Sequence, residues 1–145
     1  MLPRIAAILC LLGSSALAAA ADPLHDTVWR TFDDATGVAK AIVQLEVKHG
    51  VVTGKIIQRL EGTKITNCVK CTGALKNQPL VGLPIVYNLK AVGNNSYENG
   101  EILDPLNGKT YRLRVKLSPD EQNLEVRGFI GVSMLGRTQI WKRER

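Results

Sequence analysis

The two cysteines at Cys68 and Cys71 are the most distinctive local feature with chemical potential. Their C-x-x-C spacing is compatible with a structural disulfide, a redox site or half of a metal site. A redox motif of this kind lies where a strand enters a helix of a βαβ unit, and the surrounding sequence indicates no such unit. A zinc site needs two further ligands, whereas the only histidines, His25 and His49, lie far away along the chain. We therefore favour a structural disulfide that restrains the loop of residues 61–79, with redox and metal sites as the alternatives.

Carboxylates are the other candidates for acid–base chemistry, at Asp33, Asp34 and Asp104. The first two precede Gly37 in a turn sequence and the third precedes Pro105, and carboxylates at such positions usually accept backbone hydrogen bonds. The chain has no G-x-S-x-G nucleophile elbow and no H-E-x-x-H metal motif. We therefore predict no catalytic residue, no metal and no cofactor.

Aromatic residues near the two ends of the chain form a third group. Trp29 lies in the first predicted strand, and Trp141 and Arg143 lie in the last. If these strands are neighbours, the Arg143 guanidinium can lie across the Trp29 indole, a contact worth about 0.5–2 kcal/mol. The alternative is a core tryptophan and an unrelated surface arginine. With two tyrosines that add polar groups, the predicted ligand-binding residues are Trp29, Tyr87, Tyr111, Trp141 and Arg143.

The segments that must position these side chains have apolar residues at every second position. From residue 39 to residue 47 every odd position is apolar, while the even positions carry Lys40, Ile42, Gln44 and Glu46. This alternation predicts a strand with one buried face and one mostly solvated face. The same reasoning predicts strands at residues 28–32, 39–47, 51–60, 83–92, 97–103, 111–117, 124–130 and 137–143.

About eight strands joined mainly by short turns, without a convincing amphipathic helix, predict an all-β domain. A small antiparallel up-and-down β-barrel is favoured over a sandwich, because closure of the sheet removes exposed strand edges. A barrel of eight strands is just wide enough to be filled by side chains or to hold one small ligand.

The N-terminus, residues 1–21, has the features of a cleaved secretory signal peptide. Arg4 precedes an apolar run at residues 5–17, and small residues offer cleavage sites near Ala18 to Ala21. The run is shorter than the ~20 apolar residues that a membrane span needs. A lipid-modified cysteine would lie at the end of the apolar run, whereas Cys10 lies inside it. We therefore expect Cys10 to be removed with the signal.

Cleavage leaves residues 22–145 as one domain in the periplasm or outside the cell. Cys68 and Cys71 are then the only cysteines, and an oxidising compartment pairs them. The net charge falls from +6 to +5, because 18 Lys and Arg remain against 13 Asp and Glu once Arg4 is lost. This charge is spread along the chain, without the basic cluster and interleaved aromatics of a nucleic-acid reader. We predict no nucleic-acid partner and no membrane span, and the pattern indicates no oligomeric state.

Several short motifs are distributed over nearly the whole of this domain. They are Trp29 with the turn of residues 33–37, Gly54-Lys55-Ile56, Cys68-Val69-Lys70-Cys71, Pro79-Leu80-Val81-Gly82-Leu83, the run from Asn99 to Pro105, Gly108-Lys109-Thr110-Tyr111, the run from Leu124 to Phe129, Gly136-Arg137 and Trp141-Lys142-Arg143. Together they resemble a family of exported bacterial proteins called domain of unknown function 2147. The resemblance implies a periplasmic or secreted protein of a family without an established reaction.

The predicted barrel is also similar to lipocalins and their calycin relatives. These proteins place a G-x-W motif on the first strand and pack an arginine from the end of the barrel on its tryptophan. Thr27-Val28-Trp29 has threonine in place of the glycine, and the lipocalin T-D-x-x-N-Y motif is absent. The similarity implies binding of a small apolar or amphipathic molecule inside the barrel.

The predicted function is therefore that of an exported, lipocalin-like binding protein without catalysis, with a small hydrophobic or amphipathic ligand. The alternative is a filled-core envelope interaction or maintenance protein that acts through its outer surface. Lys64, Lys70 and Lys76 make the loop around the cysteines basic and would suit anionic envelope polymers. A cavity of a few hundred Å³ is expected only for the binding protein.

Overall fold

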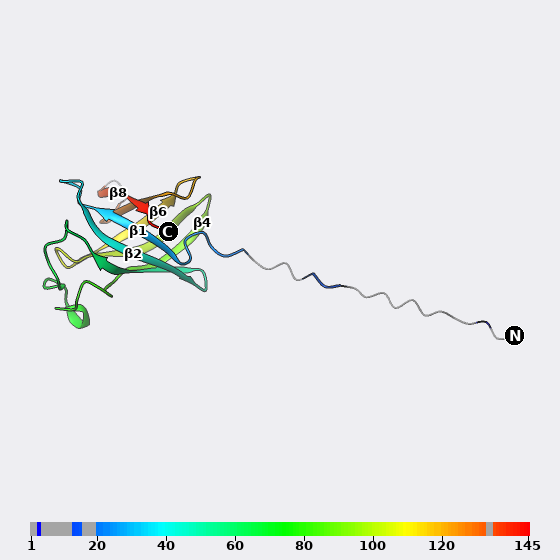
Figure 1. The fold of residues 1–145 in the computed structure, drawn as a ribbon, viewed down its shortest axis with the longest axis horizontal. Helices are drawn as coiled ribbons and strands as arrows, with labels where there is room; N and C mark the ends of the chain where they lie inside the picture. Colours follow the sequence, from blue (N-terminus) through cyan, green and yellow to red (C-terminus); the bar gives the residue numbers. More distant parts are fainter. Residues whose placement is uncertain (1–2, 4–12, 16–19, 133–134) are drawn as a thin grey trace.

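The computed structural model describes residues 3, 13–15, 20–132 and 135–145. They form a closed barrel of eight antiparallel strands in which each strand pairs with its neighbours in sequence and the last returns to the first (Figure 1). The elements are β1 (Thr27–Phe32), β2 (Ala39–Lys48), β3 (Val51–Arg59), the 3-10 helix η1 (Gly73–Leu75), β4 (Pro84–Gly93), β5 (Ser96–Asp104), β6 (Lys109–Leu117), β7 (Asn123–Phe129) and β8 (Gly136–Arg143).

The all-β fold and the up-and-down barrel predicted from the sequence are confirmed. Every predicted strand is present, and its ends agree with the structure to within two residues. The alternation works because successive side chains of a strand point to opposite faces of the sheet. In β6, for example, Leu113, Val115 and Leu117 are buried inside the barrel, while Arg112 and Arg114 are exposed.

The predicted signal peptide, residues 1–21, lies largely outside the described residues, and so does Cys10. In the described part of the chain, no helix has both the length and the hydrophobicity needed to cross a membrane.

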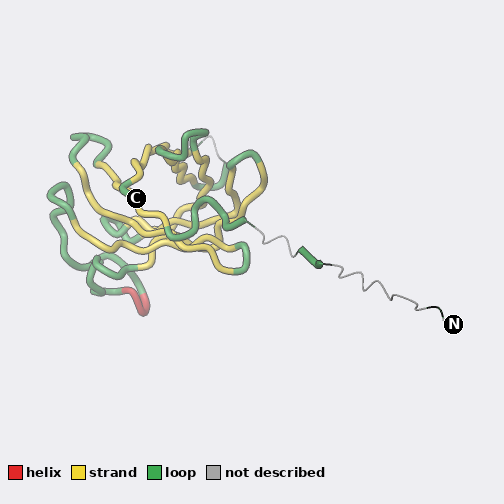
Figure 2. The backbone as a smooth tube through the Cα atoms, turned by 45° about the vertical axis from the view of Figure 1, so that its right-hand side comes forward, coloured by secondary structure: helices red, strands yellow, loops and turns green. Residues whose placement is uncertain are grey.

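The two ends of the barrel have different connections (Figure 2). At one end, two-residue turns at His49-Gly50 and Asn94-Asn95 have positive φ at both positions, as tight hairpins between twisted strands require. At the other end lie the longer connections, including residues 33–38 and the segment of residues 60–83 that contains η1. We call the first the closed end and the second the open end.

The closed end is filled by side chains. Leu24 and Trp29 are completely buried there, with Leu45, Leu117 and Leu124 packed into the same core. An eight-stranded barrel is just wide enough for its interior to be filled by side chains, and here the large apolar side chains from its walls belong to one packed core. Trp29 was predicted as a ligand-binding residue, with a core tryptophan as the alternative, and Leu24 was given no role.

A segment before β1 closes the barrel at this end. The Asp22 carboxylate oxygen Oδ1 accepts hydrogen bonds from the Leu24 amide, at 2.9 Å, and from the Tyr97 hydroxyl, at 2.7 Å. The Leu24 carbonyl in turn accepts a hydrogen bond from Thr27 Oγ1 at 2.8 Å. These bonds hold the Leu24 side chain over the core. Burial and the neighbouring Asp22 carboxylate raise the pKa of Tyr97 above its ordinary value.

The predicted contact between the first and last strands is confirmed. Trp29 is opposite Arg143 in the β1–β8 pairing, and the Arg143 guanidinium lies 5.6 Å from the centroid of the Trp29 ring. The indole nitrogen of Trp29 donates to Thr27 Oγ1 at 2.8 Å, so its polar atom is satisfied inside the core. Arg143 also donates to the Glu121 carbonyl at 3.1 Å, which ties β8 to the turn before β7.

The predicted disulfide between Cys68 and Cys71 is present, and both residues are buried. Its loop packs against the turn between β5 and β6. A Cβ atom at Gly108 would lie 1.9 Å from the Lys70 carbonyl oxygen, so only glycine permits this approach, and its φ of +73° also favours glycine. The disulfide therefore restrains a loop at the open end of the barrel.

Candidate ligand-binding cavity

A cavity of about 540 Å³ occupies the open half of the barrel interior. Its inner walls are formed by buried apolar side chains that include Val43, Ile56, Val126 and Trp141. The barrel is therefore not completely filled by its own side chains. Cavities of this size and composition are typical of sites for small molecules.

The rim of the cavity exposes large apolar side chains. Leu106, from the β5–β6 turn, is 43% exposed, and Ile130 and Leu135, from the β7–β8 segment, are 61% and 69% exposed. Ile130 was predicted as the last inward residue of a strand, but β7 ends one residue earlier, at Phe129. Its side chain consequently lies at the mouth of the cavity and outside the core.

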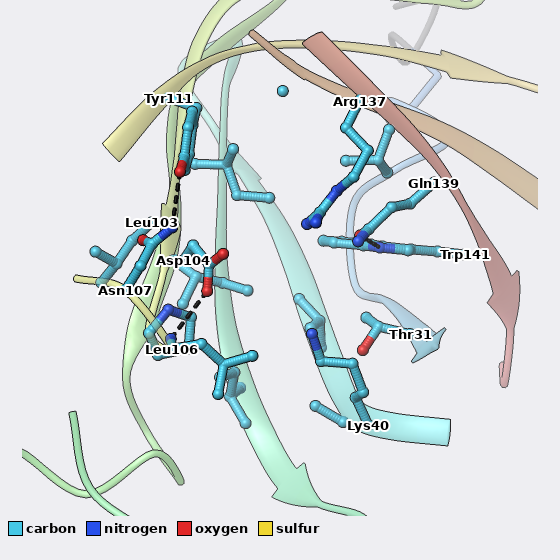
Figure 3. Close-up of a pocket in the computed structure, with 18 of the residues that line it drawn as sticks. Thr31, Lys40, Leu103, Asp104, Leu106, Asn107, Tyr111, Arg137, Gln139 and Trp141 are labelled. Atoms are coloured by element: carbon cyan, nitrogen blue, oxygen red, sulfur yellow. Dashed lines mark hydrogen bonds between the residues drawn. The ribbon is translucent and has the colours of Figure 1, made fainter. Parts of the chain in front are cut away.

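Polar groups enter the cavity from two facing walls (Figure 3). The first wall is formed by β1, β2 and β8, and the second by the end of β5, the turn that follows it and β6. The first wall contributes Thr31, Lys40, Arg137 and Gln139, and the second contributes Asp104, Asn107 and Tyr111.

The first wall is organised by one carboxylate from the β1–β2 turn. Asp34 Oδ2 lies 2.8 Å from Arg137 Nε and accepts a hydrogen bond from Gln139 Nε2 at 3.2 Å. Gln139 Oε1 accepts a longer bond, 3.4 Å, from the indole nitrogen of Trp141. The three β8 side chains are two residues apart, so they share the inner face of the strand.

The second wall is held by turn interactions. Asp104 Oδ1 accepts the Leu106 amide at 2.9 Å, which confirms the predicted backbone role of this carboxylate. Asn107 accepts the Lys109 amide at 2.8 Å and donates from Nδ2 to the Tyr111 hydroxyl at 2.7 Å. The turn therefore fixes the positions of Asp104, Asn107 and Tyr111 around the cavity.

Lys40 departs from the sequence prediction, which placed it on the solvated face of β2. In the β1–β2 pairing, Thr31 is opposite Ala41 and Phe32 is opposite Ala39, so Lys40 is an extra residue in a β-bulge. A bulge interrupts the alternation and re-aims the side chain of the extra residue. Lys40 therefore lines the cavity, and Figure 3 shows its ammonium group directed into the space between the walls.

The structure brings two of the five predicted ligand-binding residues to the cavity, Tyr111 and Trp141. Trp29 and Arg143 lie together at the closed end. Tyr87 does not line the cavity. Its hydroxyl donates to the Pro84 carbonyl at 2.9 Å, and burial, with a contribution from the Glu101 charge, raises its pKa. A role for these five residues in ligand binding stays a prediction.

Sequence reasoning missed Lys40, Arg137 and Gln139 as cavity residues. A signal for the last two was present, since they precede Trp141 by four and two residues and so share its face of an alternating strand. For Lys40, the alternation predicted a position on the solvated face of the strand, whereas the side chain lines the cavity. Among the described residues, no group of three or more His, Cys, Asp or Glu is placed to hold a metal ion.

Together, the closed eight-stranded barrel and the cavity that opens at one end define a small β-barrel with a lipocalin-like fold. The chain belongs to the family of domain of unknown function 2147, described as an uncharacterized protein conserved in bacteria, whose model matches residues 27–143.

A solved structure with the same fold is that of protein HP1028 from the human pathogen Helicobacter pylori, which is described as belonging to the lipocalin family. The match has a TM-score of 0.73 and 23% sequence identity, and it covers 83% of this chain and 82% of that one. No curated protein sequence matches the chain.

Proposed function

We propose that this protein is an exported, non-enzymatic binding protein that holds one small apolar or amphipathic molecule in the open half of its barrel. The observation that carries the proposal is the cavity of about 540 Å³, with aliphatic and aromatic inner walls and a few polar groups near the mouth. Clefts of about 300–1,000 Å³ with this distribution of groups serve as small-molecule sites.

The cavity chemistry favours binding over catalysis. The described lining residues include no histidine, cysteine or serine. Asp104, the only carboxylate among them, accepts a backbone amide through one of its oxygens. A nucleophile hydrogen-bonded to a base, the usual arrangement for covalent catalysis, is therefore not found among them.

Export is supported by two independent features. Residues 1–21 have the composition of a secretory signal peptide. The disulfide between Cys68 and Cys71 is of the kind that persists in oxidising compartments.

A cavity-filling variant tests the binding function. The uncharged dye N-phenyl-1-naphthylamine, whose fluorescence rises in apolar surroundings, should bind the protein with one site. Ala41 is buried and lines the cavity, so Ala41→Phe should abolish the fluorescence rise while the melting temperature changes little. Val92→Phe, at a position of β4 that is 52% exposed and does not line the cavity, is the matched control and should bind the dye like the wild type.

Native mass spectrometry before and after organic extraction complements this test. Protein isolated from the periplasm without denaturation should carry an extra mass that extraction removes. Equal dye binding by the Ala41→Phe and wild-type proteins would place the dye outside the barrel and contradict the proposal.

A further inference from the structure

Lys40 places an unneutralised charge at the cavity. It lies at the start of β2, near the mouth, and is only partly exposed. Within the described part of the chain its ammonium group forms no hydrogen bond or ion pair. Its own carbonyl accepts the Leu60 amide and the Thr63 hydroxyl, both at 2.8 Å, so the backbone of the bulge is firmly held.

The two carboxylates of the β1–β2 turn, Asp33 and Asp34, have other partners. Asp33 Oδ1 accepts the amides of Ala35 and Thr36 and the Thr36 hydroxyl, all within 3.0 Å. These bonds, led by those from Thr36 and with a smaller contribution from the Lys40 charge, lower the pKa of Asp33. Asp34 Oδ2 is shared by Arg137 and Gln139. Neither carboxylate neutralises Lys40 by direct contact.

The charge of the cavity as a whole is positive. Three cationic side chains, Lys40, Arg59 and Arg137, line it in the described part of the chain, against one lining carboxylate, Asp104. Asp34, which does not line the cavity, pairs with Arg137, so these five side chains sum to one positive charge. Arg59 donates to the Thr63 carbonyl at 3.0 Å. Asp104 projects from the wall opposite Lys40 (Figure 3). A negatively charged group is therefore best placed on the Lys40 side of the mouth.

Building on the proposed binding function, we propose that the ligand is a single-chain amphiphile with a monoanionic head group, of which a fatty carboxylate is the simplest example. The head group accepts a hydrogen bond from the Lys40 ammonium, next to Arg137. The chain extends toward the apolar floor that contains Val43, Ile56 and Trp141. A charge-assisted hydrogen bond in a partly water-excluded site is stronger than one between neutral groups.

Two ligands with the same chain separate the head-group contact from apolar burial. Decanoate and 1-decanol compete with N-phenyl-1-naphthylamine for the barrel at neutral pH. We expect wild-type protein to bind decanoate about tenfold more tightly than decanol, the lower end of the range for hydrogen bonds to charged groups. Lys40→Met should lose this preference and retain decanol binding.

Lys55→Met is the matched control. Lys55 is exposed on the adjacent strand β3 and does not line the cavity, so this substitution removes the same charge from the protein. It should keep the preference for decanoate. An equal loss in both lysine variants would attribute the preference to overall charge and would overturn the assignment of Lys40.

A second variant is expected to bind decanoate more tightly. Such a gain cannot be explained by a folding defect. Asp104→Asn removes the only described carboxylate of the cavity and keeps an oxygen for the Leu106 amide. It should strengthen decanoate binding several-fold relative to decanol binding. If wild-type protein bound decanol and decanoate equally well, the proposal of an anionic ligand would be overturned, and the proposed binding function would stand. Failure of dye, decanol and decanoate to bind would overturn the proposed binding function, and this inference with it.

Discussion

The closed and open ends of the barrel are built from the same eight strands, yet they have different cores. At the closed end, where two of the connections are two-residue turns, the buried side chains of Leu24, Trp29 and Tyr97 fill the interior. At the open end, longer connections form a rim around a cavity of about 540 Å³. Completely buried side chains such as Trp29 lie at the closed end, and the polar groups that line the cavity lie at the open end.

This difference assigns stability to the closed end of the barrel and the proposed ligand binding to the open end. A filled core stabilises the fold through burial and dispersion contacts, and each side chain removed from it leaves a cavity. A binding site requires the opposite, an interior that the protein's own side chains do not fill. Because the closed end is well packed, the open end can leave apolar surface uncovered within the same small domain.

The largest expected effect comes from the same substitution made at both ends. Leu24 is fully buried at the closed end, whereas Leu135 is 69% exposed at the rim. Leu24→Ala should lower the free energy of unfolding by about 2–5 kcal/mol, and Leu135→Ala should change it by no more than about 0.5 kcal/mol. Urea denaturation measures both changes. Leu135→Ala should instead weaken dye binding, and similar stability losses in the two variants would remove the distinction between the ends.

A smaller effect is expected from reduction of the disulfide. The Cys68–Cys71 bond closes a very small ring, so the loop-entropy model gives roughly 2 kcal/mol at most. The bond lies at the open end, and its loss should therefore increase amide hydrogen exchange in residues 60–83. Exchange in the closed-end halves of β6 and β7 should not change when the samples with and without reductant are compared. Faster exchange in β6 and β7 as well would show that the two ends are coupled.

The smallest effect concerns the pH dependence of the closed end. Burial and Asp22 raise the pKa of Tyr97, so the folded state keeps the phenol proton at a pH where the unfolded state has lost it. The resulting stability is fully present below about pH 10 and decreases as the pH rises further. Between pH 10 and pH 11, the free energy of unfolding of the wild type should fall by up to about 1 kcal/mol more than that of Tyr97→Phe. Parallel slopes in alkaline urea titrations would contradict the raised pKa.

Much of the fold was predictable from local pattern. A two-residue period that holds nearly throughout, together with apolar β-rich runs such as residues 83–92, located all eight strands, and turn residues such as His49-Gly50 placed their boundaries. The contact of Arg143 with Trp29 followed from barrel closure, because closure makes the first and last strands neighbours. The disulfide was predictable because Cys68 and Cys71 are the only cysteines in residues 22–145 and an oxidising compartment pairs them.

The candidate site was predicted only in part. Tyr111 and Trp141 line the cavity, whereas Trp29, Arg143 and Tyr87 do not. Aromatic character alone does not distinguish a residue that plugs one end of a barrel from a residue that faces a vacant space at the other. That distinction depends on how far along its strand the residue lies and on what the opposite wall contributes.

The sequence by itself determined the strands and their order and, where the alternation is regular as in β6, the inward face, since these depend on the two-residue period and on turn chemistry between neighbours in the chain. Only the tertiary structure decided that Lys40 points inward, because the bulge arises from the register of β1 against β2. It also decided that Leu24 closes one end and that a cavity remains at the other. These outcomes depend on the sum of side-chain volumes from all eight strands, a quantity that no local pattern contains.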